Sequence, residues 1–544
     1  MKKLLLLSLS LGSLLSWAQE SPRAHWIFLR ESALDYTQPM LGDDALARRA
    51  AQGIALRNTD FALQSEAVAA VARVAPPVGR SRWLRALVVK ADAQQLAELR
   101  ELPWVRATQP VGIKKRSLTE VAHGFAGPTP EAALRSAGSH SARCGEEDGV
   151  NGYQYGASTQ QVNQIQVNAL HDAGFDGAGV KVALMDAGFS GADTFTAFQG
   201  AWQQGRVLGT WDYIDGDTNV FHLGSHGMSV WSTICADLDA TLVGTAPKAS
   251  FYLFKTENQL TETIAEEYNW VMAAERADSL GVDVINTSLG YTTFDNGVGD
   301  HSYADMDGRS TPISLAAVAA ARTGMILCVS AGNEGSSSWK YISAPADADS
   351  ILAVGAVDEF GVRASFSSQG PSADGRVKPD VAARGLGAAV VNSSGNVATS
   401  SGTSFSSPIM AGAMASLVQA AKTLPNGYTA NDLIHRVRMS AHRSFAPDSF
   451  LGYGIPNFAT VLNGLGIAQP DALRDWTLHS LNQGGWVLRR SDARSADALE
   501  VIAVDGRLLD RLEVPAGQNE VRLDARSFWF TVRSRTQVVT VPAN

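Results

Sequence analysis

The chain has 544 residues, of which 45% are hydrophobic and 18% charged, and its formal net charge is −9. This length suits one large domain with two small ones beside it, and the hydrophobic fraction is sufficient for a sizeable core. The negative charge argues against nucleic acid as a partner. Three cysteines exclude a disulfide framework, and Cys235 and Cys328, which lie in apolar runs, are expected in the core.

The first residues have the pattern of a secretory signal peptide, which we assign to residues 1–18. Lys2 and Lys3 precede the apolar run 4–15, and residues 16–18 (Ser-Trp-Ala) have the small-x-small pattern of a cleavage site. That run is too short for a membrane span, and no other stretch is long and apolar enough to cross a bilayer. We therefore expect a secreted protein, extracellular or at the cell surface, with no transmembrane segment.

A small α+β module is predicted for residues 19–112. Apolar runs with strand-like alternation and one helical run mark its elements, at 25–29, 86–90, 92–102 and 105–108. Residues 113–155 follow with a short basic run and then many Gly, Ser, Pro and Asn residues. This composition is typical of an exposed linker, and such linkers are preferred sites of proteolytic cleavage.

Residues 156–465 are predicted to form the largest domain. Apolar strand-like runs alternate there with helical stretches such as 265–277 and 313–322. Alternation of this kind is typical of a mostly parallel sheet with helices on both faces, so the predicted fold class is α/β with three layers.

Two polar residues in this domain stand at the ends of apolar runs. Asp186 ends the strand-like run 180–185, and a parallel sheet places its site residues at that end of a strand. His226 stands just before the helical run 230–236, which places its imidazole in the first turn of that helix. His222 lies close by, but His226 is preferred because it precedes a glycine and begins the helix.

The segment 402–408 (Gly-Thr-Ser-Phe-Ser-Ser-Pro) places Ser404 between a tight glycine turn and a helix-compatible run. A serine there lies at a helix N-terminus, where its local field is positive, and Pro408 fits the first turn of such a helix. Alone, Ser404 could be a helix cap, His226 a surface histidine and Asp186 a turn former. Together they favour nucleophilic catalysis, because a serine needs a base to take its proton and that base needs an acceptor to orient it.

Asp186, His226 and Ser404, in that order along the chain, resemble the catalytic residues of the subtilisin-type serine peptidases, family S8. The resemblance covers residues 161–461, and its most specific parts are the serine segment and the histidine segment. The family usually has Thr or Ser after the aspartate, where this chain has Ala187. The resemblance implies a subtilisin-like three-layer fold. It also implies that the serine is the nucleophile, the histidine the general base and the aspartate its partner.

The resemblance extends to the oxyanion and substrate sites. Segment 329–335 is similar to the family segment whose Asn side chain donates a hydrogen bond to the oxyanion, which implies that role for Asn333. The Ser404 amide would be the second donor. Without the resemblance, Asn333 would be read as a turn residue. Segment 284–290 is similar to the strand that pairs with the substrate backbone. The substrate-binding residues implied on the two walls of the pocket are Ser288, Leu289, Gly290, Ser330, Ala331 and Gly332.

The resemblance identifies the 19–112 module as an inhibitory propeptide, which occupies the substrate cleft during folding and is then removed by cleavage within the linker. It implies no cofactor for catalysis and no metal in the catalytic site. Structural calcium stays an expectation, because many members of the family bind it. Two acidic clusters have spaced carboxylates and a turn glycine, but neither has a complete calcium loop, and solvated turns are favoured at Asp212, Asp215, Asp217, Asp305 and Asp307.

Residues 470–544 are predicted to form a small all-β domain, since short strand-like runs alternate with turns. These runs lie at 476–488, 498–504, 508–512, 520–523, 528–532 and 538–541. The domain resembles the C-terminal sorting domain of the type IX secretion system of Bacteroidota through the segment 504–509, although residues 526–529 replace its usual Gly-Leu-Tyr segment. The alternative is a β-rich domain that stabilises the enzyme or binds a partner.

We therefore predict a secreted serine endopeptidase that acts on protein or peptide substrates, is inhibited by its own propeptide and engages type IX secretion machinery. An alternative is a catalytically inactive protein of the same fold that binds peptides along residues 288–290 by β-augmentation, although the four catalytic-type residues argue against it. A third is a narrow processing enzyme that matures other exported proteins. The sequence does not separate broad from narrow proteolysis, since the loops around the cleft set specificity.

Overall fold

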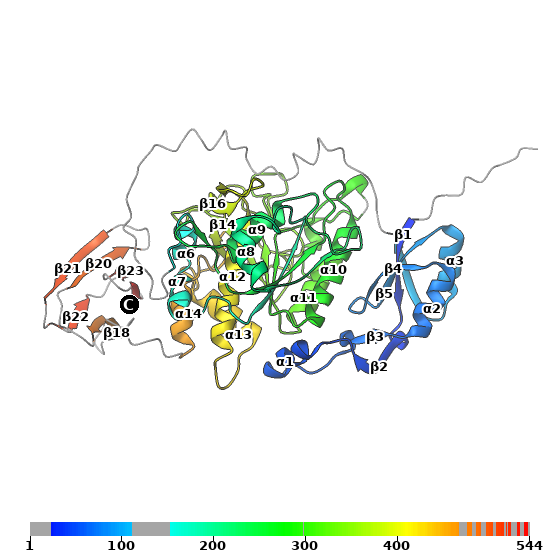
Figure 1. The fold of residues 1–544 in the computed structure, drawn as a ribbon, viewed down its shortest axis with the longest axis horizontal. Helices are drawn as coiled ribbons and strands as arrows, with labels where there is room; N and C mark the ends of the chain where they lie inside the picture. The colour runs from blue at the N-terminus through cyan, green and yellow to red at the C-terminus, as the bar shows by residue number, and fades with distance from the viewer. Residues whose placement is uncertain are drawn as a thin grey trace, which may run out of the picture.

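The computed structural model describes residues 23–110, residues 153–466 except 298, and the C-terminal strands with their nearest neighbours between 476 and 541. The predicted signal peptide, Cys144 and all but the last three residues of the predicted linker lie outside the described residues. Figure 1 shows an N-terminal module in blue, a large central domain from cyan to orange, and C-terminal strands in orange to red. No helix within the described residues is long and apolar enough to cross a membrane.

Within residues 23–110, an antiparallel sheet of four strands has the order β4-β5-β1-β6. The strands and the two helices on one face of the sheet are β1 (Arg23–Leu29), β4 (Pro77–Ser81), β5 (Ala86–Ala91), β6 (Val105–Pro110), α2 (Ser65–Val74) and α3 (Ala93–Glu101). Neighbouring residues of β1 face opposite sides of the sheet. Ile27 and Leu29 pack beneath the two helices, whereas Trp26 packs on Tyr268 of the central domain, with ring centroids 4.3 Å apart.

A second part of the N-terminal module, residues 34–63, forms an arm that lies below the central domain in Figure 1. The arm consists of β2 (Leu34–Pro39), α1 (Asp43–Ala51) and β3 (Phe61–Leu63), of which β2 and β3 pair antiparallel. Gln52, just after α1, donates to the Gly324 carbonyl and accepts from the Ala430 amide, both at 2.9 Å. The arm, which the sequence did not predict, therefore contacts two separate segments of the central domain.

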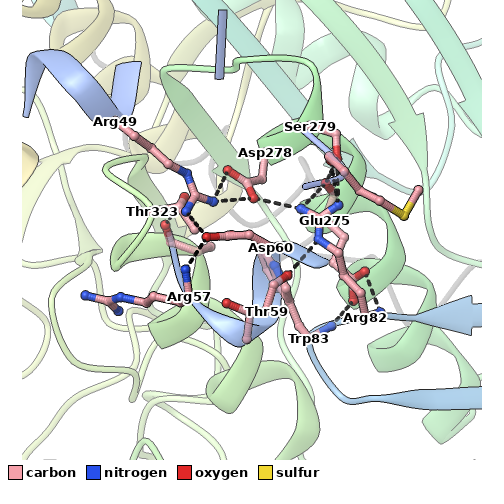
Figure 2. Close-up of polar contacts among 12 residues, drawn as sticks. Arg49, Arg57, Thr59, Asp60, Arg82, Trp83, Glu275, Asp278, Ser279 and Thr323 are labelled. Atoms are coloured by element: carbon pink, nitrogen blue, oxygen red, sulfur yellow. Dashed lines mark hydrogen bonds and ion pairs between the residues drawn. The ribbon is translucent and has the colours of Figure 1, made fainter. Parts of the chain in front are cut away.

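Buried charges join the N-terminal module to helix α10 (Ile264–Ser279) of the central domain (Figure 2). Asp278 is fully buried, and its carboxylate pairs with three arginines, Arg48 at 2.5 Å, Arg49 at 2.8 Å and Arg82 at 2.7 Å. Glu275 accepts three hydrogen bonds, from Ser81 Oγ and from the amides of Arg82 and Trp83. Because buried charges need ionic and hydrogen-bond partners, this network holds the module on α10.

In residues 153–466, seven parallel strands form one sheet with the order β15-β14-β13-β12-β7-β11-β8. The strands are β7 (Lys181–Asp186), β8 (Val207–Asp212), β11 (Ser250–Lys255), β12 (Val284–Thr287), β13 (Ile326–Ser330), β14 (Leu352–Val357) and β15 (Val381–Arg384). From β7 the chain runs first to β8 at the sheet edge, returns to β11 between β8 and β7, and then crosses to β12, so that all later strands are added on the opposite side of β7. The strand order thus reverses at β7, and the carboxyl end beside such a reversal is where open α/β sheets bind ligands.

Helices cover both faces of this sheet, which confirms the predicted α/β fold. The helices α9 (His226–Cys235) and α12 (Thr403–Ala421) pack on one face, while α10 and α11 (Pro312–Ala321) pack on the other. Along β7, Val182 and Leu184 belong to the first core, and their neighbours Ala183 and Met185 to the second. A strand that is buried on both faces is apolar at successive positions, which explains the unbroken apolar runs of the sequence.

Further elements complete the central domain. They are α6 (Thr159–Gln164), α7 (Asn168–Asp172), α8 (Thr196–Gln203), α13 (Ala430–Ser440), α14 (Phe458–Gly464), β9 (Asp237–Leu238), β10 (Leu242–Val243), β16 (Ala388–Val391) and β17 (Val397–Ser400). Cys235 and Cys328 are buried and unbridged, as expected from their apolar runs.

The described C-terminal strands form two antiparallel sheets, with the orders β18-β19-β22 and β21-β20-β23-β24. They are β18 (Trp476–Ser480), β19 (Trp486–Arg490), β20 (Asp497–Ala503), β21 (Leu508–Val514), β22 (Glu520–Leu523), β23 (Phe530–Arg533) and β24 (Val538–Val541). Each strand-like run predicted here overlaps a strand. Residues 504–507, which carry most of the resemblance to a sorting domain, lie outside the described residues, so that identification stays a prediction.

Candidate active site

Asp186, His226 and Ser404 come from three separate elements of the central domain. Asp186 ends β7, His226 begins α9 and Ser404 is the second residue of α12. His226 Nδ1 lies 2.6 Å from Asp186 Oδ1, and Asp186 is fully buried. When Nδ1 carries the proton and donates it to this carboxylate, Nε2 is left as the basic atom of the ring.

Two glycines allow α9 to approach the end of β7 this closely. A Cβ atom on Gly227 would lie 2.7 Å from the Gly188 carbonyl oxygen and 2.8 Å from Asp186 Cβ. Gly188 has a φ of 136°, and a Cβ atom there would overlap the Leu223 carbonyl oxygen. Both positions exclude a side chain, which accounts for glycine one residue after the histidine and two residues after the aspartate.

His222, the competing histidine, lies in a different cluster. Its Nε2 is 2.9 Å from Asp215 Oδ2 and 3.7 Å from Asp212 Oδ2. Asp212 also pairs with Lys255, at 2.8 Å. The structure therefore brings His226, and not His222, to Asp186.

Other acids that the sequence placed in turns accept hydrogen bonds from the nearby backbone. Asp217 accepts from the Asn219 amide at 2.8 Å, and Asp305 from the Ser302 amide at 2.7 Å. Asp307 accepts from the amides of the two residues at 309 and 310, both at 2.8 Å. Such short-range bonds are typical of aspartates that form turns.

The surroundings of His226 act on its pKa in two opposing directions. Burial lowers the pKa because it disfavours the charged imidazolium, whereas the charge and the hydrogen bond of Asp186 raise it. Glu257, which lies two residues beyond β11, adds a negative charge that also raises it. The net result is a pKa of His226 above the ordinary value of 6.5, which suits a base that must hold a proton during the reaction.

Helix α12 is joined to the strand segment after β12 through Ser404. Pro408 is the sixth residue of α12, so the prediction that it stands in the first turn is wrong. Because proline has no N–H, the Ser404 carbonyl lacks the donor that a helix supplies four residues on. Ser288 Oγ donates to that carbonyl at 2.9 Å instead, and Ser404 Oγ donates to the Ser288 carbonyl at 3.4 Å. The two serines are therefore linked in both directions.

Asn333 Nδ2 and the Ser404 amide nitrogen both lie near Gly402. Thr403 donates to Asn333 Oδ1 through its amide at 2.9 Å and through its hydroxyl at 3.0 Å. These bonds fix the amide oxygen and leave Nδ2 as the free end of the side chain. A Cβ atom on Gly402 would lie 3.7 Å from both Asn333 Nδ2 and Ser404 N, so the two donors flank one position. Two N–H donors close to one point are what a developing oxyanion requires.

The six predicted substrate-binding residues lie at the carboxyl ends of the adjacent strands β12 and β13. Ser330 Oγ donates to the Leu289 carbonyl at 3.4 Å, which joins the two segments. A Cβ atom on Gly290 would overlap Ser343 Oγ, and one on Gly332 would lie 3.1 Å from the same oxygen. Ser343 thus stands between the two walls, and glycine on each wall leaves the space that it needs.

Sequence reasoning missed Thr403, Ser343 and Glu257. Thr403 and Ser343 gain their importance from contacts with segments far away in the chain. Thr403 lies within the serine segment 402–408, but that pattern does not reveal its contact with Asn333. Glu257 is 5% exposed, and burial raises its pKa to about 7, although a hydrogen bond from the Tyr291 hydroxyl opposes that rise. A signal for Glu257 does exist, because it follows a buried strand that pairs directly with β7.

A sequence model of the subtilase family, Peptidase S8, matches residues 177–454, and a model of the Bacteroidota peptidase S8 propeptide domain matches residues 24–123. The chain is 32% identical to subtilisin E of Bacillus subtilis over 318 residues, which are 57% of this chain and 73% of that protein. It is 31% identical to a subtilisin of Bacillus pumilus over 301 residues, 54% of this chain and 95% of that protein. The solved structure of the prenylagaramide maturation protease PagA covers 55% of this chain and 98% of its own, with 22% identity and a TM-score of 0.43.

Proposed function

The chain belongs to the subtilase family of serine endopeptidases, and we propose that Asp186, His226 and Ser404 are its catalytic triad. The observation that carries this proposal is the 2.6 Å contact of His226 Nδ1 with the buried Asp186 carboxylate, at the strand where the sheet order reverses. The start of α12 lies beside this pair, since the Phe405 ring is 6.0 Å from the His226 ring. The nucleophile and its base thus come from neighbouring helix ends.

In the proposed reaction, Ser404 Oγ forms a bond to the carbonyl carbon of the scissile peptide while His226 Nε2 takes the hydroxyl proton. The electron pair of the C=O bond moves to the oxygen, which accepts hydrogen bonds from Asn333 Nδ2 and the Ser404 amide. When the C–N bond breaks, His226 passes the proton to the leaving amine. A water molecule then attacks the acyl carbon while His226 takes one of its protons. The ester bond to Ser404 breaks, His226 returns the proton to Ser404 Oγ, and the acid product leaves. Asp186 stabilises the imidazolium during both acylation and deacylation.

The N-terminal module is the propeptide domain of the family, and we propose that it inhibits the enzyme until the linker at 113–155 is cleaved. The network of Asp278 and Glu275 supports this, because it holds the module on α10. Strand β6 ends at Pro110, just before that linker. We propose secretion from the pattern of residues 1–18 together with the Bacteroidota type of propeptide, and export by type IX machinery from segment 504–509.

The triad is tested by treating the full-length chain with a fluorophosphonate probe and locating the adduct by mass spectrometry. We expect an adduct on Ser404 that is lost in His226→Ala and kept in Ser394→Ala, a control serine in an exposed loop. Full peptidase activity in Ser404→Ala would contradict the triad. A chain that has lost its propeptide and still forms no adduct would favour the inactive peptide-binding alternative.

A further inference from the structure

The substrate segment, residues 288–290, is held by a side chain at each end. At its start, Ser288 Oγ donates to the Ser404 carbonyl at 2.9 Å. Just after its end, the Tyr291 hydroxyl donates to the Glu257 carboxylate. Tyr291 is 1% exposed and Glu257 5%. This second hydrogen bond is therefore shielded from water, where its contribution is larger than at the surface.

The backbone pairing of the segment changes at Tyr291. Tyr291 pairs with Ala344 in both directions, through amide-to-carbonyl hydrogen bonds of 2.9 and 3.1 Å. By contrast, no hydrogen bond within the described residues uses the amide or the carbonyl of Gly290. A peptide that adds to a strand edge needs main-chain groups of this kind. The position of Tyr291 therefore fixes where a substrate strand can pair.

Tyr291 and Glu257 follow strands that lie on opposite sides of β7. The sheet order places β12 and β11 directly beside β7, and Tyr291 lies in the loop after β12 and Glu257 in the loop after β11. Asp186 is the last residue of β7, and the Thr256 amide donates to its carbonyl at 3.0 Å. The Tyr291–Glu257 hydrogen bond thus joins the two segments that border the aspartate of the proposed triad.

Glu257 has a further hydrogen-bond partner, the carboxyl of Glu266 in the first turn of α10. The Glu266 carboxyl is hydrogen-bonded to Glu257 and to the Thr263 backbone. A hydrogen bond between two carboxyls requires that one of them keeps its proton. Burial raises the pKa of Glu266 well above its ordinary value, which makes Glu266 the donor. Glu257 therefore accepts from Tyr291 and from Glu266, and these two donors fix the place of its carboxylate.

We propose that Tyr291 and Glu257 are positioning residues of the peptidase, which hold the substrate segment beside Asp186 so that a bound peptide strand presents its scissile bond to the triad. This inference rests on the proposed function, because it takes residues 288–290 as the strand that binds substrate. Tyr291 belongs to the core on one face of the sheet, whereas α9 and α12, which carry the histidine and the serine of the triad, pack on the other face. The pair thus acts through the segments that it joins.

The proposal is tested with Tyr291→Phe, which removes the hydroxyl and keeps the buried ring. The chain is produced at full length, allowed to mature, and assayed on two substrates. A tetrapeptide amide is long enough to pair with Gly290, whereas the ester of a single acylated amino acid is not. We expect the KM of the tetrapeptide to rise about tenfold or more, the equivalent of one hydrogen bond to a charged group. The kcat of the tetrapeptide and both constants of the ester should stay within about twofold of the parent.

Two further variants separate this hydrogen bond from general stability. Glu257→Gln keeps an acceptor for the Tyr291 hydroxyl, so the KM of the tetrapeptide should stay within about threefold of the parent. Tyr155→Phe is the matched control, because it also removes a tyrosine hydroxyl, one that contacts His171 Nδ1 at 2.8 Å. It should leave the kinetic constants of both substrates unchanged.

A parent chain that hydrolyses neither substrate would overturn the proposed function and this assignment with it. If Tyr291→Phe hydrolyses both substrates as the parent does, or loses activity equally on both, the assignment alone is overturned, because the hydrogen bond is then only structural. If Tyr291→Phe does not mature, Glu257→Asp replaces it, since its shorter side chain withdraws the carboxylate from the Tyr291 hydroxyl. An unchanged KM of the tetrapeptide in Glu257→Asp would then overturn the assignment.

Discussion

Thr403 sets the orientation of the side chain that we propose as an oxyanion donor. Its amide and hydroxyl both donate to Asn333 Oδ1, and the Gly332 amide donates to the Thr403 hydroxyl at 3.2 Å. A rotated Asn333 amide would turn its NH₂ group toward two donors, which is unfavourable. The hydroxyl of Thr403 thus belongs to a short chain of hydrogen bonds that ends at the proposed oxyanion site.

We expect Asn333→Ala to lower kcat by about 10²–10³-fold with little change in KM, because its donor acts on the charge that develops during the reaction. Thr403→Val keeps the amide bond but loses the hydroxyl, and should lower kcat roughly tenfold, the equivalent of one hydrogen bond. Thr403→Ser should restore the rate. Steady-state kinetics on a peptide substrate measure these effects. An unchanged kcat in Thr403→Val would show that the amide alone holds Asn333.

The raised pKa of His226 predicts the acid side of the pH–rate profile. Only the neutral imidazole accepts the serine proton, so kcat/KM falls as the pH drops through the His226 pKa. Since that pKa lies above its ordinary value of 6.5, we expect half-maximal kcat/KM above pH 6.5. Asp186→Asn removes the charge that raises the pKa while burial still lowers it, so its profile should shift to lower pH. A parent profile centred at or below 6.5 would contradict this account.

At the scale of elements, the missing N–H of Pro408 allows α12 to be tied to the substrate segment, because Ser288 Oγ fills the vacant position on the Ser404 carbonyl. A helix with a full set of hydrogen bonds would not need this side chain. The contact connects the residue that we propose as nucleophile with the first of the substrate-binding residues. It positions the two segments relative to one another without any direct strand pairing.

Ser288→Ala should leave the Ser404 carbonyl without a hydrogen-bond donor, which should lower the free energy of unfolding by about 1–3 kcal/mol. Pro408→Ala restores a helical N–H to that carbonyl, so the double variant should recover most of the loss. Thermal unfolding of the four chains, each carrying Ser404→Ala to prevent self-digestion, measures the coupling. Strictly additive losses of the two substitutions would show that the carbonyl is not their point of contact.

The order of the elements was predictable where apolar runs end in polar residues. Asp186 follows an apolar run and His226 precedes one, and the strand of Asp186 and the helix of His226 were predicted from those patterns. Helix α1 was not predicted, because its stability comes from Arg48 and Arg49, whose partner Asp278 lies some 230 residues away.

At the scale of the whole molecule, the propeptide network divides its charges by sign, with the arginines on the propeptide and the carboxylates on α10. Arg48, Arg49 and Arg82 belong to the propeptide and would depart with it, whereas Asp278 and Glu275 belong to α10, and we expect both carboxylates to become exposed to water. Charged groups are stable in water, so the mature enzyme does not need the arginines. In the complex, by contrast, each side depends on the other, and the network favours the bound state only while both sides are intact.

Asp278→Asn therefore tests the network directly. It leaves three arginines buried with one charged partner fewer, and breaking a buried pair in this way costs about 3–5 kcal/mol, so the propeptide should bind at least a hundredfold more weakly. After cleavage of the linker, we expect less propeptide to co-elute with the enzyme and a shorter lag before activity. Glu31→Gln is the control, because Glu31 is exposed and its pair with Arg85 spans 3.8 Å. This substitution should change neither the amount of co-eluting propeptide nor the lag before activity. Equal lags in Asp278→Asn and the parent would mean that the sheet packing around Trp26, and not the buried charges, holds the propeptide in place.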